Sequence, residues 1–91
     1  MDALAKICVS GMVQGVGFRY FVSSLANSFN LVGIVKNLYD GQVYIEVEGN
    51  KDIIVAFLQE LRIGNRFSDV QEVKVEWEAF TGKYNHFDIT H

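Results

Sequence analysis

The segment from Gly11 to Arg19 constrains this chain more than any other. It reads GMVQGVGFR and holds three of the eight glycines within seven positions. An apolar run typical of a strand precedes it at residues 5–9, and a helical pattern begins at Phe18. A glycine-rich turn between a strand and a helix can direct several backbone N–H groups at one point, where the helix dipole adds positive potential. Because the planar guanidinium of Arg19 suits phosphate, the segment predicts a cradle for a small anion such as a phosphoryl group.

Two known phosphate-binding motifs do not fit these glycines, which stand at positions 11, 15 and 17. No lysine follows them, as a nucleotide P-loop would require, and their spacing is not that of the dinucleotide fingerprint. The single cysteine, Cys8, lies in the preceding strand pattern, whereas a cysteine-dependent phosphatase needs its thiol inside the loop. We therefore interpret Cys8 as a packing residue and the cradle as one of backbone amides and Arg19.

Hydrophobic periodicity predicts the elements along the chain, and Asp40-Gly41 between two strand patterns indicates a hairpin. The order βαββαβ with a C-terminal β extension predicts an α+β fold. We expect a ferredoxin-like split β-α-β sandwich, in which two helices cover one face of an antiparallel sheet and the first and third strands are adjacent. We expect one domain over residues 1–91. The predicted elements are strands at 4–10, 31–38, 42–48, 70–79 and 87–89, and helices at 18–29 and 51–63.

Alternation within the strands predicts which side chains face the core. In the third strand, Glu46 and Glu48 are expected in water. Asn37 stands out at the end of the second strand because asparagine is depleted in strands. On this pattern alone it fits a turn-forming residue and a functional residue equally well. The residues of the fourth strand that we expect to be buried are Val73, Val75 and Trp77.

The charge balance narrows the classes of partner. Eleven acidic and eight basic residues give a formal net charge of −3, which argues against a nucleic-acid binder. An anionic substrate would have to be held by a local field. No apolar run reaches the length of a membrane span and no signal peptide is evident, so we expect a cytoplasmic monomer without membrane attachment. A single cysteine leaves no internal disulfide and no multi-cysteine metal site.

Two motifs of this sequence resemble the acylphosphatase family. Residues 11–19 match the family signature Gly-x-Val-Gln-Gly-Val-x-Phe-Arg at every fixed position. Residues 33–37, Gly-Ile-Val-Lys-Asn, match its Gly-x-x-x-Asn pattern, and Asp40-Gly41-x-Val43 through Gly49 follows. The resemblance extends over essentially the whole chain in length and in element order.

This resemblance implies an enzyme that hydrolyses acyl phosphates to a carboxylate and inorganic phosphate, with no metal, no other cofactor and no phosphoenzyme. It implies that Arg19 binds the phosphoryl group and that Asn37 orients the attacking water. Inorganic phosphate or sulfate would bind as a product-like ligand. Two positions depart from the family pattern: Ile34 stands where an aromatic residue is common, and the last residue is not aromatic. These departures bear on the efficiency of the enzyme, its leaving-group preference or its stability, and not on the type of reaction. The residues whose backbone would complete the cradle are Gln14, Gly15, Val16, Gly17 and Phe18.

The residue types agree with such chemistry. The carboxylate released from an acyl phosphate is a stable leaving group, so no strong general acid is required. His86 and His91 are expected at the surface or at a strand edge, which leaves the site without a histidine. The pattern also offers no paired carboxylates to hold magnesium. What remains is positioning and charge stabilisation, which is most of what phosphoryl transfer asks of a protein.

Two alternatives come from other functional classes. A non-catalytic module of the same fold could bind phosphate or carboxyl phosphates without turnover, although the presence of both Arg19 and Asn37 argues against it. RNA-recognition domains share the βαββαβ order, but they need aromatic residues on a central strand face and basic flanks. Here the outer face of the third strand carries Glu46 and Glu48.

Overall fold

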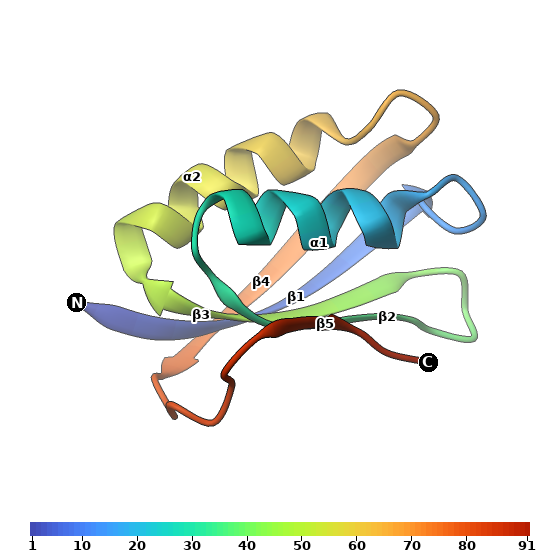
Figure 1. Ribbon diagram of the computed structural model, residues 1–91. Helices are drawn as coiled ribbons and strands as arrows, with labels where there is room; N and C mark the ends of the chain where they lie inside the picture. Colours follow the sequence, from blue (N-terminus) through green and yellow to red (C-terminus); the bar gives the residue numbers. More distant parts are fainter.

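A computed structural model describes residues 1–91 as a five-stranded sheet with two helices packed on one face (Figure 1). The expected order of elements is confirmed, and each boundary lies within two residues of its predicted position. The elements are β1 (Asp2–Met12), α1 (Phe18–Ser28), β2 (Val32–Asn37), β3 (Val43–Asn50), α2 (Lys51–Ile63), β4 (Asp69–Ala79) and β5 (Phe87–Ile89).

The strands lie in the order β4-β1-β3-β2-β5, so β1 and β3 are central neighbours as expected. Four of the strands pair antiparallel, whereas β5 pairs parallel with β2, and the sheet is therefore mixed. β4 and β5 lie at opposite edges although they are consecutive in the chain. Residues 80–86, which we call the crossing connector, therefore pass beneath the sheet on the face away from the helices (Figure 1).

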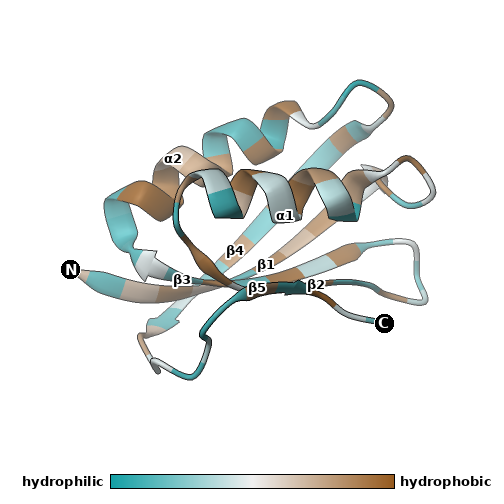
Figure 2. Cartoon of the chain, viewed as in Figure 1, coloured by the Kyte–Doolittle hydropathy of each residue, from teal (hydrophilic) through white to brown (hydrophobic).

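The core lies between the two helices and the inner face of the sheet. Alternate residues of β1 and β3 are fully buried there, and the apolar stripes of α1 and α2 close over them (Figure 2). Burial of such side chains stabilises the fold by about 1.5–3 kcal/mol each. The largest fully buried apolar side chains include Phe18, Phe57, Ile7, Ile45, Ile54 and Leu61.

Gly11 belongs to β1 and not to the loop that follows. The pairing of β1 with β4 shifts register between Ser10 and Gly11, and a Cβ at position 11 would lie 2.1 Å from the carbonyl oxygen of Asp69. Glycine is therefore required here by the close approach of a neighbouring backbone. The first glycine of the motif serves the sheet, and the cradle is limited to the residues after it.

Two sequence expectations about exposure are wrong. Glu48 is 1% exposed, and the Glu46 side chain is 14% exposed, because the crossing connector covers the outer face where both lie. Trp77 is 37% exposed, and Val73 and Val75 are half-buried, because β4 is an edge strand that the helices cover incompletely. Alternation places these side chains on the correct faces, but coverage of a face depends on the tertiary path of the chain.

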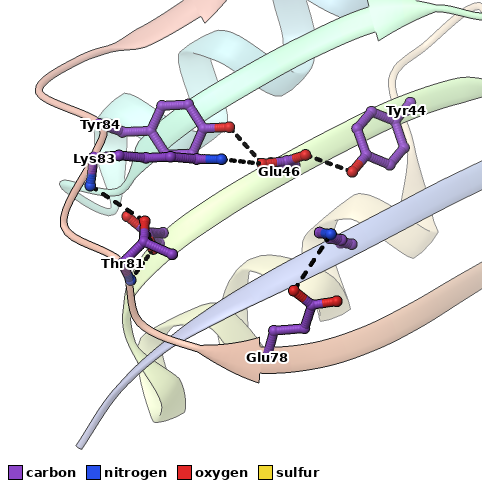
Figure 3. A network of polar contacts seen from close by, with 8 residues as sticks. Tyr44, Glu46, Glu78, Thr81, Lys83 and Tyr84 are labelled. Atoms are coloured by element: carbon purple, nitrogen blue, oxygen red, sulfur yellow. Dashed lines mark hydrogen bonds and ion pairs between the residues drawn. The ribbon is translucent and has the colours of Figure 1, made fainter.

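The two glutamates bind the crossing connector to the sheet, and Figure 3 labels Glu46 with the connector residues Lys83 and Tyr84. Glu48 Oε2 accepts hydrogen bonds from the Thr81 backbone N–H at 2.6 Å and from its hydroxyl at 2.7 Å. Glu46 accepts from the hydroxyl of Tyr44 at 2.6 Å and from the hydroxyl of Tyr84, and Lys83 Nζ lies 3.6 Å from Oε1. Burial raises the pKa of both phenols, and the Glu46 carboxylate raises it further.

The Glu46 carboxyl should make the stability of the protein pH-dependent. Burial acts to raise its pKa, but the two phenol hydroxyls and the neighbouring ammonium groups outweigh burial, so the pKa lies below its usual value. A lowered folded-state pKa stabilises the fold above the unfolded-state pKa, and this contribution is lost as the pH falls through the folded-state value.

We expect Glu46→Gln to lower the free energy of unfolding at pH 7 and to flatten its fall toward pH 3, measured by urea denaturation. The matched control is Glu76→Gln, at an exposed position of β4. If Glu46→Gln lowered the free energy of unfolding by the same amount at every pH, the lowered pKa of Glu46 would be contradicted.

Candidate active site

The cradle loop, residues 13–17, leaves the end of β1 and delivers the chain to the start of α1. Gly15 and Gly17 have φ values of 74° and 73°, in the left-handed region that glycine adopts without strain. Gly17 is the N-cap of α1, and no side chain caps the helix there. The first N–H groups of α1 therefore open onto the loop, where an anion can accept from them.

Arg19 and Asn37 come together in one cavity of about 230 Å³ beside this loop. They belong to different elements, Arg19 to the first turn of α1 and Asn37 to the end of β2. Exposed Tyr20 lies at the same cavity. The residues that line it are Val13, Gly15, Gly17, Phe18, Arg19, Tyr20 and Asn37.

Two of the predicted cradle residues, Gln14 and Val16, do not line the cavity. The Gln14 carboxamide instead donates to the carbonyl oxygens of Leu38 and Gln42, both at 2.8 Å. These two residues flank the β2–β3 turn, and Leu38 N–H also donates to the Gln42 carbonyl at 2.8 Å. We call this contact the Gln14 clasp; it fixes the cradle loop to the hairpin that carries Asn37.

Asn37 is not the residue that forms the β2–β3 turn. Asp40 does so, since its carboxylate accepts from the Gln42 N–H at 3.0 Å. Asn37 Oδ1 is buried and has no hydrogen-bond partner within the protein. A buried acceptor left unpaired costs about 1–3 kcal/mol. Because Asn37 lines the cavity, a partner from outside the chain can reach this one. Of the two interpretations that the sequence left open, the functional one fits this geometry.

Arg19 keeps its charge free of carboxylates, since none of the ion pairs in the structure involves it. Its neighbour Phe18 is 1% exposed and packs against Phe21 at 5.6 Å between ring centroids, which anchors the start of α1. The guanidinium therefore projects from a fixed turn of helix and can form charge-assisted hydrogen bonds to an oxyanion.

His91 reaches the site, which the sequence analysis did not expect. His86 and His91 are both exposed, as predicted, but His91 Nδ1 lies 3.4 Å from Arg19 Nη1. Arginine can only donate, so the imidazole nitrogen accepts. The contact exists because β5 adds to the edge of β2, beside α1. No local pattern carries this information, so the sequence offered no signal for it.

The described residues bring no group of three or more His, Cys, Asp or Glu side chains together as metal ligands. Neither helix has the length and apolar character needed to cross a bilayer. A larger surface cavity of about 560 Å³ lies on the outer face of the sheet, where Lys6, Cys8 and Tyr44 are among its lining residues. Neither Arg19 nor Asn37 contributes to it.

Fold and site together define a small α+β protein with a cavity at the start of its first helix, lined by an arginine, an asparagine and two glycines. A family model described as Acylphosphatase matches residues 5–89. An acylphosphatase from Bacillus licheniformis is 42% identical over 86 residues, covering 94% of this chain and 96% of that protein. An acylphosphatase from Thermotoga maritima is 44% identical over 90 residues, covering 92% and 99%.

The crystal structure of acylphosphatase from Bacillus subtilis matches the present structure with a TM-score of 0.94 at 37% identity, and the match covers both chains completely. The chain belongs to the acylphosphatase family, a family of hydrolases. The family resemblance of the two motifs is confirmed, and so is the ferredoxin-like α+β fold.

Removing the Gln14 clasp should destabilise the protein, because two partly buried carbonyls each lose one of their donors. We expect Gln14→Ala to lower the free energy of unfolding by about 1–2 kcal/mol, measured by urea denaturation at pH 7. Gln59→Ala on the exposed face of α2 is the control and should be neutral or slightly stabilising, since alanine favours helix. Equal effects of the two substitutions would show that the clasp contributes nothing to stability.

Proposed function

We propose that this protein is a metal-independent acylphosphatase, a cytoplasmic monomer that hydrolyses small acyl phosphates to a carboxylate and inorganic phosphate. One observation carries the proposal: Arg19 and Asn37, from separate elements, line the same cavity as the glycine turn that begins α1. Inorganic phosphate and sulfate are the product-like ligands that it should bind.

Phosphoryl binding is assigned to Arg19 and the backbone of the cradle loop. The guanidinium can bridge two phosphoryl oxygens, and each charge-assisted hydrogen bond contributes about 1.5–3 kcal/mol. The N–H groups at the start of α1 and the helix dipole add to the field at the same place. These groups hold the transferring phosphoryl group and stabilise the charge that it carries in the transition state.

Asn37 is assigned to the attacking water. Its Oδ1, buried and unpaired within the protein, can accept a hydrogen bond from that water, and its Nδ2 can donate one to the water oxygen. Holding the water in line with the bond that breaks converts a bimolecular step into an effectively unimolecular one. The P–O bond to the carboxylate breaks as the water oxygen bonds to phosphorus, and the carboxylate departs without a proton from the enzyme.

The water is deprotonated late, by an oxygen of the substrate itself. Asn37 is uncharged and cannot take the proton at neutral pH, and this scheme uses no other group of the protein as a base. Solvent isotope effects and the pH–rate profile test the step. A steep basic limb that belongs to a protein group would contradict it.

Hydrolysis of benzoyl phosphate, with and without a chelator, is the primary test. We expect turnover that a chelator does not reduce and that inorganic phosphate inhibits competitively. Phosphate binding without turnover would support the alternative, a non-catalytic phosphate-binding module of the same fold. Loss of activity on chelation would overturn the metal-independent mechanism.

Substitutions at the two assigned residues should separate binding from chemistry. Arg19→Ala should weaken both inhibition by phosphate and turnover. Asn37→Ala should leave phosphate inhibition nearly unchanged and lower kcat by about 10²–10³, the scale of one positioned polar group. Arg62→Ala and Asn27→Ala, at exposed helical positions, are the matched controls. An Asn37→Ala variant that loses phosphate affinity but keeps its kcat would contradict the water-positioning role.

A further inference from the structure

Asn65 contacts the cradle loop from a distant part of the sequence. It lies in the turn between α2 and β4, 49 residues from Val16, and its Nδ2 donates to the Val16 carbonyl oxygen at 2.9 Å. A Cβ at Gly17 would lie 3.9 Å from the same nitrogen, so the Asn65 carboxamide packs directly against the turn that begins α1. No motif that the sequence analysis singled out contains this residue.

The turn holds Asn65 firmly. Its backbone N–H donates to Ser68 Oγ at 2.9 Å, and its carbonyl accepts from the Ser68 hydroxyl at 3.2 Å and from the Ser68 N–H at 3.3 Å. Only the nitrogen end of the carboxamide can face the Val16 carbonyl, because that carbonyl can only accept. The direction of the side chain is therefore fixed by its partner.

This contact determines where the next amide points. In a trans peptide the carbonyl and the following N–H point in opposite directions within one plane. Asn65 fixes the Val16 carbonyl, and Val16 does not line the cavity whereas Gly17 does. With the carbonyl of this peptide held by Asn65, the orientation of the Gly17 N–H in the same plane is fixed as well, at a residue that lines the cavity.

We propose that Asn65 is a positioning residue that aims the Gly17 amide at the bound phosphoryl group. The proposal rests on the proposed function for the identity of the ligand, but its physical content is the orientation of one peptide. Without the side-chain donor, the peptide between Val16 and Gly17 can rotate, and the cradle loses a preorganised hydrogen bond to an anion.

The test uses Asn65→Ala and Asn65→Asp, the second of which keeps the size of the side chain but cannot donate when ionised. We expect the inhibition constant for inorganic phosphate and the KM for benzoyl phosphate to rise together by about tenfold, the scale of one hydrogen bond to a charged group. The kcat should change by less than about threefold, since the lost contact is made in ground and transition state alike. Asn85→Ala, in the exposed crossing connector, is the control and should change neither constant.

A second measurement follows the NMR resonance of the Gly17 amide proton. In the wild-type protein, phosphate should shift the Gly17 amide proton resonance downfield, and Asn65→Ala should reduce that shift at saturating phosphate. A purely structural role for Asn65 would lower the melting temperature without this selective change. A wild type without a Gly17 shift would overturn the proposal even if both variants fail to fold. Folded variants that match the wild type in phosphate affinity and in the Gly17 shift would overturn it as well.

The two proposals fail in different ways. If the wild type hydrolyses no acyl phosphate, but phosphate shifts its Gly17 amide and Asn65→Ala reduces that shift, the proposed function is wrong and the role of Asn65 stands. If the wild type is active and the Asn65 variants keep its KM, its phosphate inhibition constant and its Gly17 shift, the role of Asn65 is wrong and the proposed function stands.

Discussion

The Gln14 clasp is the interaction on which the geometry of the site depends. The cradle loop follows β1, and Asn37 ends β2 beyond the whole of α1, so nothing in the local chain fixes the distance between them. The Gln14 carboxamide spans this gap with two hydrogen bonds to the β2–β3 hairpin. Asn65 secures the same loop from its other side, through the Val16 carbonyl. A loop held at both sides can present amides to a ligand with little reorganisation.

A protein of net charge −3 can hold an anion at this place because its charges are segregated. The carboxylates of Glu46 and Glu48 lie on the outer face of the sheet, where Glu46 contacts two hydroxyls and Lys83, and Glu48 accepts two hydrogen bonds from Thr81 through one oxygen. Arg19 belongs to the first turn of α1, which packs on the opposite face of the sheet, and it forms no ion pair within the protein. The positive end of α1 adds to the same local field, so the overall charge of the chain does not decide what the cavity attracts.

Local patterns in the sequence were sufficient to predict the elements and their order, since periodicity and turn chemistry act over a few residues. That Arg19 and Asn37 share a site was implied only by the resemblance of the two motifs to the family, and both residues do line one cavity. The local patterns did not predict the burial and the contacts that depend on the tertiary path of the chain. The burial of Glu48 and the contact of His91 with Arg19 both follow from a chain that crosses beneath the sheet and adds a strand at its far edge. The exposure of Trp77 follows from the edge position of β4. The outward turn of Gln14 depends on carbonyls that only the folded hairpin brings within reach.

A crystal structure of the protein with sulfate bound is the most direct test of this account. We predict an oxyanion in the cavity within about 3 Å of the Arg19 guanidinium and of the Gly17 amide nitrogen, with Asn37 facing it across the space for a water. An oxyanion seated instead on the outer face of the sheet, with the side chains of Arg19 and Asn37 turned away from each other, would contradict it.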